Sequence, residues 1–414
     1  VLDDEPSDAT AELGAVRYRD AFAGQSDERD FEQRSEDDIF IVCTGGTTGF
    51  PKGVMWRHED VFFAALQGGR AGGDPIERPI EIGRIAQQGD EAWTLYAAPP
   101  FIHGTAIYSA LITFFAGGKL VISRSPSYDA ARMVDLIERE RIEVLVMVGD
   151  AMLLPFIREV EKRGDRADLS SLSVITSQGA ILSASTRKRL EELLPAVMIL
   201  NNFGATEAGH QGQSVTDDED GGEDGRTRFA LDENGALIDE ELRVVEPKPG
   251  ARGRIARKGH IPLGYYKDEK KTAETFIEVD GARWVIPGDW GEYDENGLVV
   301  LLGRGSICIN SGGEKIYPEE VEEVLKGHPD IYDALVVGVP DERFGQRVAA
   351  VIQLEPGASA EPEAWREYLR SRLAGYKTPR EWHVVDAVPR QINGKPDYKT
   401  AKAIAEAGTH RVDG

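Results

Sequence analysis

The chain has 414 residues, enough for two or three domains with a buried core. Its net charge of -24, from 48 Lys+Arg and 72 Asp+Glu, disfavours non-specific binding to nucleic acid or to an anionic membrane. The sequence has no apolar run of membrane-spanning length, no N-terminal signal segment and no Cys/His cluster with zinc spacing, and Cys43 and Cys308 lie far apart. We therefore expect a cytoplasmic protein without nucleic-acid partners or integral membrane contact.

The N-terminal part combines a connector, a strand and a loop. Residues 1 to about 38 are acidic and weakly patterned, and we expect them to connect to a domain core that begins at Ile39. The apolar run 39–42 predicts a buried strand. It leads into a segment that is rich in Gly and Thr, with Thr44, Gly45, Gly46, Thr47, Thr48, Gly49 and Lys52.

Such a loop suits oligophosphate, because glycines expose backbone N–H groups and threonines supply hydroxyls. Lys52 adds a positive charge at its end. The pattern differs from a Walker A loop, since Lys52 lies between Pro51 and Gly53. A surface turn is the alternative interpretation of the segment.

From residue 93 onward, strand and helix patterns alternate. Continuous apolar runs predict strands at residues 95–98, 119–122, 144–148, 173–176 and 197–200. Apolar residues at helical spacing predict helices around residues 133–137, 153–160 and 185–194. This alternation predicts a parallel sheet that helices cover on both faces.

The pattern changes after an acidic low-complexity segment at residues 216–225. This segment is expected to be a solvated loop, with metal binding by its carboxylates as the alternative. Asp-Glu-Asn-Gly occurs twice beyond it, at residues 232–235 and 294–297, each time between alternating runs. These turns predict hairpins, and therefore a small antiparallel or β-barrel-like subdomain.

The last part of the chain predicts a second domain. Pro318 is suited to the first position of a helix, and Gly327 ends that helix. Strands at 334–339 and 348–354, a helix around Trp365 and a strand at 382–385 follow. We expect an α/β fold with a large domain, residues 1–303, and a mobile α+β domain, residues 304–414, joined by a hinge near residues 304–308.

Candidate ligand-binding and catalytic residues lie next to the predicted strands and hairpins. Thr206 and Glu207 come after a strand that ends at Leu200, where open α/β sheets bind ligands. Asp289 and Arg304 flank a predicted hairpin, and can together bind ribose hydroxyls and phosphate. Lys395 lies in a Gly-containing loop. The alternatives are a structural Asp289–Arg304 ion pair, a helix-start role for Glu207 and an ordinary solvated Lys395.

Six ordered stretches, residues 43–53, 202–207, 287–289, 303–318, 373–379 and 389–395, resemble the motifs of the adenylate-forming superfamily. This superfamily includes acyl-CoA synthetases, peptide adenylation domains and luciferases. The resemblance covers about residues 39 to 400, and members usually carry a further hundred or more residues before the Gly/Thr loop. We therefore expect part of the family fold to be missing from this sequence.

The resemblance implies an ATP-dependent acid–thiol ligase that forms an acyl-adenylate and then a thioester. It implies that the Gly/Thr loop and Lys52 hold phosphates, that Thr206 contacts the α-phosphate and that Glu207 helps to hold Mg²⁺. Asp289 would bind ribose, and Arg304 ribose or phosphate. Lys395 would bridge the carboxylate and the α-phosphate. Further nucleotide or CoA contacts are implied for Gly179, Ala180, Asn202, Phe203, Gly204, Gly312 and Gly313.

The same resemblance implies that the small domain rotates between the two steps. The rotation would withdraw Lys395 and present the glycines at 312–313 to the pantetheine arm of CoA. The residue at the usual hinge position is Ser306. Three classes of protein remain open: an acyl-CoA ligase, an acyl-AMP ligase that delivers to a carrier protein, and an inactive homologue that only binds an acyl ligand. A homo-oligomer is compatible with all three.

The substrate-binding residues implied by the resemblance indicate a hydrophobic acid. Ile102 occupies the position where amino-acid adenylation domains place an Asp, so an amino acid is disfavoured. His103 would gate the acyl tunnel, or serve as a hydrogen-bonded structural histidine, and Gln178 and Gly204 would line its wall. The stretches at residues 51–60, 258–266 and 312–315 resemble actinobacterial ligases for long-chain and steroid side-chain acids.

Overall fold

The computed structural model describes residues 14, 16, 18–26, 28, 30–44, 52–70, 73–78, 80–90, 92–123, 125, 127–180, 182–214, 227–391 and 394–412. The chain divides into two compact units, Val1–Asp38 and Ile39–Gly414, as the change of composition at residue 38 predicts. The first unit contains the short helix α2 (Tyr18–Phe22). The predicted acidic loop, residues 216–225, lies outside the described residues.

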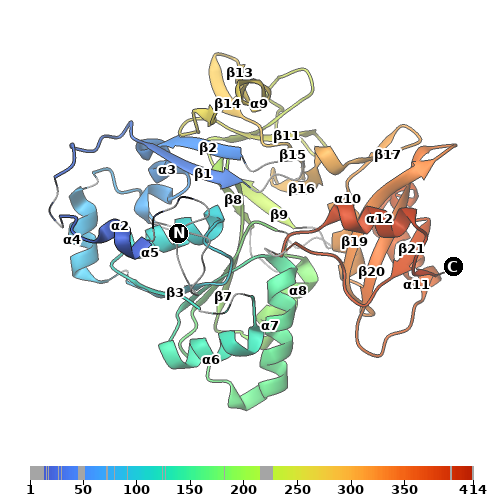
Figure 1. The fold of residues 1–414 in the computed structure, drawn as a ribbon. Coiled ribbons are helices and arrows are strands. Elements are labelled where there is room, and N and C mark those ends of the chain that lie inside the picture. The colour runs from blue at the N-terminus through green and yellow to red at the C-terminus, as the bar shows by residue number, and fades with distance from the viewer. Residues whose placement is uncertain are drawn as a thin grey trace. The chain divides into compact units, whose positions relative to one another are not determined.

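A parallel sheet forms the centre of the second unit (Figure 1). Its strands run in the order β4 (Lys119–Val121), β3 (Thr94–Ala97), β5 (Val144–Met147), β6 (Val174–Ser177) and β7 (Met198–Ala205). Its helices are α5 (Gly104–Phe115), α6 (Ala130–Glu140), α7 (Gly149–Arg163) and α8 (Ala184–Leu193). The predicted helix-covered parallel sheet is confirmed.

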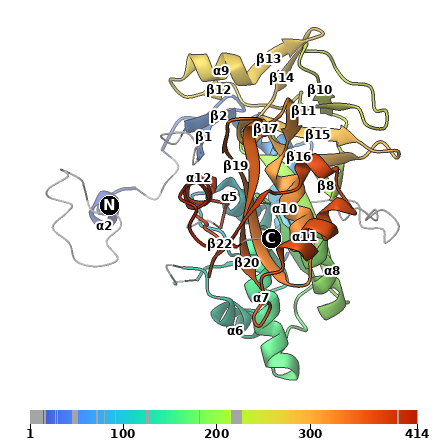
Figure 2. The same ribbon diagram turned by 90° about the vertical axis from the view of Figure 1, so that its right-hand side faces the viewer.

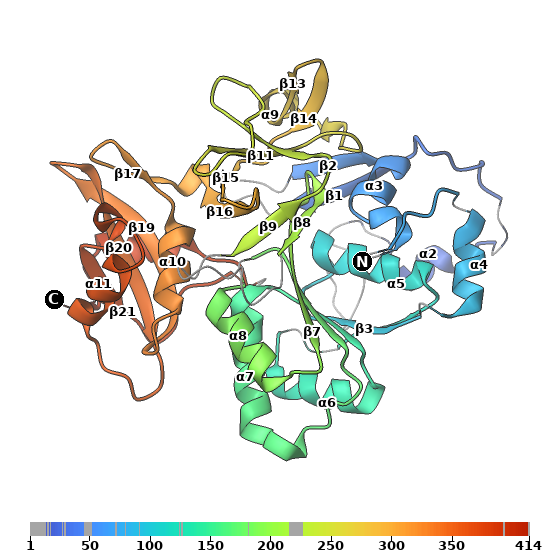
Figure 3. The ribbon, with the colours of Figure 1, turned by 180° about the vertical axis from the view of Figure 1, so that it is seen from behind.

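The two faces of this sheet are covered differently (Figure 3). Helices α6, α7 and α8 pack on one face, where Leu145 and Ile175 are fully buried against Ile137 and Phe156. On the other face, Ala106 of α5 packs against Leu95 and neighbouring strand residues. Because side chains alternate along a strand, each strand supplies both faces.

Antiparallel strands continue the sheet beyond β7. They are β8 (Gly209–Ser214), β9 (Arg228–Leu231), β10 (Gly235–Ile238), β11 (Arg252–Arg257), β13 (Phe276–Val279), β14 (Ala282–Val285), β15 (Asp289–Tyr293) and β16 (Val299–Arg304). Strands β15 and β16 form the hairpin predicted around residues 294–297. The β-rich part expected after the acidic segment is therefore joined edge to edge with the parallel sheet.

The hairpin predicted at residues 232–235 is wrong. The turn itself forms, since the Gly235 N–H donates to the Asp232 carbonyl at 2.9 Å. The flanking strands, however, pair elsewhere: β9 pairs with β8 and β16, and β10 pairs with β11. A turn sequence directs a chain reversal, but the partner of each strand is chosen by the surrounding sheet.

A smaller sheet carries the start of the core. Its strands are β1 (Ile39–Thr44), β2 (Lys52–Arg57) and β12 (Gly264–Tyr265), with β2 between the other two. The prediction of a buried strand at 39–42 is wrong in part. Val42 is 3% exposed, whereas Ile39 and Ile41 are 47% and 44% exposed. Among the described strands, β1 pairs with β2 alone, so it is an edge strand.

Further short helices and 3₁₀ turns occur along the chain. They are α3 (His58–Ala64), α4 (Ile80–Gln88), α9 (Glu269–Thr275) and the 3₁₀ turns η1 (Gln67–Gly69), η2 (Gly164–Arg166), η3 (Gly305–Ile307) and η4 (Gly375–Lys377). Helix α3 packs onto β2, where Trp56 is completely buried with Val61 and Ala64. Within the described ranges, none of the helices is both long and apolar enough to cross a bilayer.

The C-terminal residues form a sheet of their own. Its strands are β17 (Ile309–Ser311), β18 (Glu314–Ile316), β19 (Ile331–Asp341), β20 (Gly345–Leu354), β21 (Glu381–Val384) and β22 (Arg411–Val412). Helices α10 (Pro318–Lys326) and α11 (Pro362–Arg370) cover one face, and α12 (Tyr398–Glu406) covers the other (Figure 2). This sheet begins just after the predicted hinge segment. The movement of residues 304–414 as a mobile domain stays a prediction.

Candidate active site

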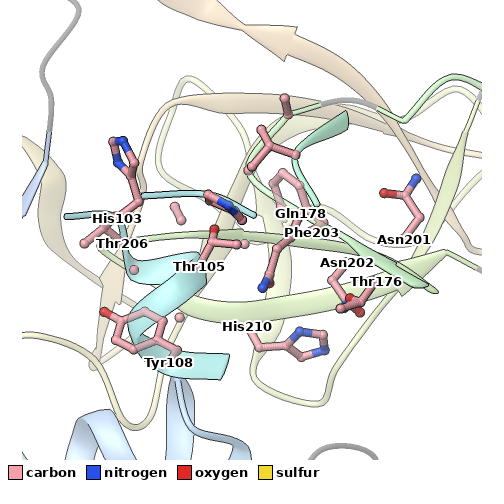
Figure 4. A pocket seen from close by; sticks show the side chains of 18 of the residues that line it. His103, Thr105, Tyr108, Thr176, Gln178, Asn201, Asn202, Phe203, Thr206 and His210 are labelled. Carbon is pink, nitrogen blue, oxygen red and sulfur yellow. The ribbon is translucent and has the colours of Figure 1, made fainter. Parts of the chain in front are cut away.

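One cavity of about 1290 Å³ connects the parallel sheet, helix α5, the β15–β16 hairpin and the loop before α12. Its lining includes residues just beyond the carboxyl ends of β6 and β7, among them Gln178, Gly179 and Thr206, where parallel sheets bind ligands. Side chains from α5, including Thr105 and Tyr108, lie around the same space as Asn202, Phe203 and His210 (Figure 4). The cavity is therefore bounded by segments that are far apart in the sequence.

Asp289 and Arg304 meet at one end of the cavity. They are opposite residues in the register of β15 and β16, and the Arg304 Nε donates to the Asp289 Oδ1 at 3.2 Å. Asp289 raises the pKa of Arg304. The pair is the ion pair that was the alternative interpretation, yet both side chains also line the cavity. A ligand with hydroxyls and a phosphate can therefore reach both groups.

Thr206 and Glu207 lie in the turn between β7 and β8. The helix-start role considered for Glu207 is wrong, because a strand follows it rather than a helix. The Thr206 carbonyl accepts a hydrogen bond from the Trp56 Nε1 at 3.1 Å, and the Glu207 Oε1 accepts one from the Tyr265 hydroxyl at 2.9 Å. Both residues of the turn therefore accept hydrogen bonds from the small β1–β2–β12 sheet.

Lys395 points into the same end from the C-terminal part. Its loop is closed by hydrogen bonds from the Gln391 N–H to the Lys395 carbonyl and from the Gly394 N–H to the Gln391 carbonyl, both at 2.9 Å. Burial lowers the pKa of Lys395 and Arg304 lowers it further, while Glu207 and Asp289 act in the opposite direction. The ammonium therefore lies close enough to Arg304, Glu207 and Asp289 to interact with their charges, while the residue as a whole stays exposed.

His103 lies near this charged end, at the start of α5. Burial lowers its pKa, and the charge of Lys395 adds to the effect. A neutral imidazole is thus favoured near neutral pH. The position is compatible with the predicted gate at the acyl tunnel, and Figure 4 shows His103 beside Thr206.

Lys52 stands at the first position of β2. Its ammonium pairs with the Asp268 Oδ2 at 3.0 Å and lies 5.5 Å from the centre of the Tyr265 ring. Thr44, at the end of β1, also lines the cavity, and its hydroxyl is 3.5 Å from the Lys52 carbonyl. Gly45, Gly46, Thr47, Thr48 and Gly49 lie outside the described residues.

The floor of the cavity is apolar and comes from the second face of the parallel sheet. It is formed by alternate residues of neighbouring strands, among them Leu95, Val144, Val146, Val174 and Leu200. The residues between them point into the core under α6, α7 and α8. Two polar residues, Thr176 and Asn202, interrupt this apolar floor. The Asn202 amide donates a hydrogen bond to the Thr176 hydroxyl at 2.8 Å.

Most of the predicted site residues that the structure describes line this cavity: Thr44, Lys52, His103, Gln178, Gly179, Ala180, Asn202, Phe203, Gly204, Thr206, Glu207, Asp289, Arg304, Ser306 and Lys395. Gly312 and Gly313 are not among its lining residues. They form the exposed turn between β17 and β18. The structure therefore gathers the predicted adenylation residues and leaves the predicted thioester-forming glycines outside.

Several contacts were not predicted from the sequence. Trp56 and Tyr265 lie within stretches used for the family resemblance, but the sequence does not show that they hold Thr206 and Glu207. Their positions follow from the pairing of β2 with β12. Tyr108 is a further neighbour of Glu207. Burial is the main cause of the raised pKa of Tyr108, and the negative charge of Glu207 is the second cause.

A group of buried carboxylates on α10 also reaches the cavity. Burial raises the pKa of Glu319 to about 8, and those of Glu322 and Glu323 to about 7. The Thr227 N–H and hydroxyl donate to the Glu323 Oε1 at 3.0 and 2.6 Å. Through Glu323, helix α10 therefore contacts the residue that precedes β9 of the large sheet.

A buried ion pair supports the same docking. The Lys326 ammonium pairs with the Asp150 Oδ2 at 3.0 Å, and the Ser185 hydroxyl donates to the Lys326 carbonyl at 3.1 Å. Burial acts to raise the pKa of Asp150, but Lys326 and several hydrogen bonds outweigh it and lower the pKa. The arrangement that brings Lys395 into the cavity is thus held by specific contacts.

Residues 1–266 match the AMP-binding enzyme family, and residues 320–395 match the C-terminal domain of AMP-binding enzymes. The fold and the family matches together define a nucleotide-binding α/β enzyme, and its cavity has an apolar floor. The chain belongs to the AMP-binding enzyme family.

Curated relatives agree with this assignment. The chain is 44% identical over 411 residues to the "Medium/long-chain-fatty-acid--CoA/3-oxocholest-4-en-26-oate--CoA ligase" of Mycolicibacterium smegmatis. The matched region covers 98% of this chain and 74% of that protein. It is 43% identical over 400 residues to the "3-oxocholest-4-en-26-oate--CoA ligase" of Rhodococcus rhodochrous, covering 94% of the chain and 70% of the relative.

Solved structures share the fold. ATP-bound MatB from Rhodopseudomonas palustris superposes with a TM-score of 0.75 and 25% identity, over 96% of this chain and 76% of MatB. The o-succinylbenzoate CoA synthetase MenE from Bacillus subtilis, solved with its acyl-adenylate intermediate, has a TM-score of 0.73 and 22% identity, over 97% of this chain and 77% of MenE.

Proposed function

We propose that this protein is an ATP-dependent acyl-CoA ligase that converts a hydrophobic carboxylic acid into an acyl-adenylate and then into an acyl-CoA thioester. The observation that carries the proposal is the continuity of the cavity, in which the charged end around Lys395 and Arg304 adjoins an apolar floor. A carboxylate can be held at the charged end while its hydrocarbon part lies on the floor.

In the first step, a carboxylate oxygen attacks the α-phosphorus of ATP and pyrophosphate leaves. Two anions must approach one another, so positioning and charge neutralisation dominate catalysis. Lys395 is assigned to the carboxylate and the α-phosphate, and Thr206 to the α-phosphate. Lys52 and Thr44 are assigned to the departing phosphates, and Asp289 to the ribose hydroxyls.

The donor set also fits a Mg²⁺ ion bound with ATP. Mg²⁺ prefers carboxylate and phosphate oxygens, and Glu207 offers a carboxylate at the cavity wall beside the groups assigned to phosphate. When bound, the ion would neutralise phosphate charge and polarise the α-phosphate. The tyrosine hydroxyl on one oxygen of Glu207 leaves its second oxygen available.

In the second step, the thiol of CoA attacks the acyl carbonyl and AMP leaves. For this step we propose that the C-terminal part rotates about the segment that contains Ser306. Lys395 then leaves the cavity, and the exposed turn with Gly312 and Gly313 approaches the acceptor. Glycines at this turn leave room for a narrow pantetheine chain.

The substrate class follows from the floor and from the relatives. Val144, Val174 and Leu200, which are partly exposed on neighbouring strands, offer an apolar surface rather than a pocket for a charged side chain. The relatives named above act on medium- and long-chain fatty acids and on a steroid side-chain acid. We propose the same class of acids for this chain.

The test is pyrophosphate release and CoA consumption with ATP, Mg²⁺ and a panel of acids from acetate to long-chain and steroid acids. We expect release with the large apolar acids, and stoichiometric loss of the free CoA thiol. Release without thiol loss would assign the protein to acyl-AMP ligases that use a carrier protein. No release with any acid, beside an active relative as control, would contradict the ligase proposal.

A further inference from the structure

Two tyrosines lie next to Glu207, and they differ in one contact. The Tyr265 hydroxyl donates to the Glu207 Oε1 at 2.9 Å. Tyr108 is close enough for the charge of Glu207 to affect it, but its buried hydroxyl has no hydrogen-bond partner among the described residues. Tyr265 therefore restrains the carboxylate, whereas Tyr108 only packs beside it.

The position of Tyr265 is fixed by its own surroundings. The residue is 6% exposed and pairs with Val54 of β2 in the small sheet. Its N–H donates to the Thr272 hydroxyl at 2.9 Å, and its ring makes an edge contact with Phe276 at 5.9 Å between centres. A side chain held on all these sides has a single orientation, so its hydroxyl is a fixed donor.

The backbone next to Tyr265 is equally constrained. Gly264 has φ of +147°, and a Cβ built there would lie 2.5 Å from the Thr272 methyl group. The Thr272 hydroxyl donates in turn to the Asp268 carbonyl at 2.8 Å. The turn that follows β12 is thus closed by its own hydrogen bonds and needs a glycine at its start.

The same turn also contacts Lys52. The Asp268 carboxylate pairs with the Lys52 ammonium at 3.0 Å, and the ammonium lies over the Tyr265 ring. Residues 264–268 thus touch both the carboxylate assigned to the metal and the lysine assigned to phosphate. A single short segment of the chain therefore contacts both groups.

We propose that Tyr265 is a positioning residue, which orients the Glu207 carboxylate so that its second oxygen faces the metal–nucleotide site. The inference rests on the proposed function, because it requires that Glu207 binds the metal. A hydrogen bond to one carboxylate oxygen removes rotational freedom of the carboxylate and directs the other oxygen to the ion. Groups that orient a metal ligand in this way commonly affect metal affinity strongly.

The test compares Tyr265→Phe with Tyr108→Phe as the matched control. Each change removes one hydroxyl beside Glu207 and keeps the ring, but only the first removes a hydrogen bond to the carboxylate. The measurement is Mn²⁺ affinity of the complex with α,β-methylene-ATP, from the electron paramagnetic resonance signal of unbound Mn²⁺. Affinity for the nucleotide without metal is measured in parallel, and thermal melting reports folding.

Tyr265→Phe should weaken Mn²⁺ binding about 10-fold, with little change in metal-free nucleotide affinity. Tyr108→Phe should remain within about 2-fold of the wild type, since its hydroxyl makes no bond to lose. Glu207→Gln, which can still accept from Tyr265 but lacks the charge, should weaken Mn²⁺ binding at least as much as Tyr265→Phe.

Three results would overturn the inference, and they separate it from the proposed function. Unchanged Mn²⁺ affinity in Tyr265→Phe, together with a loss in Glu207→Gln, removes the positioning role and leaves the metal role of Glu207 intact. Equal losses in the two tyrosine variants indicate general loosening of the site. No effect of Glu207→Gln removes the metal role itself, and with it both the inference and that part of the proposed function.

Discussion

At the charged end of the cavity, polar side chains pair with one another, two of the pairs across separate segments of the chain, whereas the apolar floor comes from neighbouring strands of one sheet. Arg304 pairs with Asp289, Lys52 with Asp268, and Glu207 with Tyr265. The floor needs no such pairing, because aliphatic side chains are placed by strand alternation alone. Under the proposed function, the charged end carries out adenylate formation and the floor selects which acid binds. We therefore expect that each can be altered separately.

The largest expected effect separates the two reaction steps at the charged end. Lys395→Ala should lower acyl-adenylate formation by about 10²- to 10³-fold, because the variant loses the cation assigned to the developing charge. Thioester formation from supplied acyl-adenylate should be nearly unchanged. Pyrophosphate release and CoA consumption measure the two steps. Equal loss of both would contradict the assignment of Lys395 to adenylation.

The floor can be altered without touching the charged end. Val174→Phe adds bulk on the cavity side of β6. We expect kcat/KM for long-chain and steroid acids to fall about 10- to 100-fold, since a poorly fitting apolar group costs roughly 1–3 kcal/mol. Short acids and ATP should bind as before and serve as internal controls. Uniform loss across all acids would indicate damage to the sheet instead.

Glu323 of α10 extends the comparison to a carboxyl group that is buried and hydrogen-bonded to Thr227. Burial raises the pKa of Glu323 to about 7 from 4.5, so the folded protein holds a proton that the unfolded chain releases. The contribution of Glu323 to the free energy of unfolding is therefore fully present below about pH 4.5. It is lost as the pH rises through about 7.

Glu323→Gln should remove this dependence and retain an acceptor for Thr227. The loss of stability between pH 5 and 8 should be smaller than in the wild type by about 1 to 3 kcal/mol. Thermal melting across this pH range measures it, with the exposed Glu314→Gln as the control. Parallel pH profiles of the wild type and Glu323→Gln would show that Glu323 does not bind the proton.

The smallest expected effect concerns the pairing of Lys52. Asp268→Asn should tighten ATP binding by roughly 2- to 5-fold, because Lys52 no longer has to leave a partly exposed carboxylate. Asparagine can still cap α9, where Asp268 accepts from the Lys271 N–H. Asp397→Asn alters the equivalent cap of α12 and should leave ATP affinity unchanged in calorimetry. Weaker ATP binding in Asp268→Asn would mean that Asp268 holds Lys52 in its working position.

Local sequence signals predicted much of the site, but not its contacts. The turn at residues 294–297 predicts the hairpin that Asp289 and Arg304 flank, but a register shift between Trp290 and Gly291 is needed to place the two residues opposite one another. The turn at 232–235 has the same four residues, yet its strands pair elsewhere, because neighbouring strands compete for their edges. The bond between Tyr265 and Glu207 spans 58 positions and has no local signal.

The sequence by itself determined the alternation of strands and helices and the positions of Lys395, Glu207 and Arg304 in their motifs. These features depend on side-chain periodicity and on residue types suited to turns and phosphates. Only the tertiary structure decided that β1 is an exposed edge strand, that the β12 turn contacts both Lys52 and Glu207, and that α10 buries its glutamates. Those outcomes depend on which distant strands pair and which helix face is covered, and both are settled by packing of the whole chain.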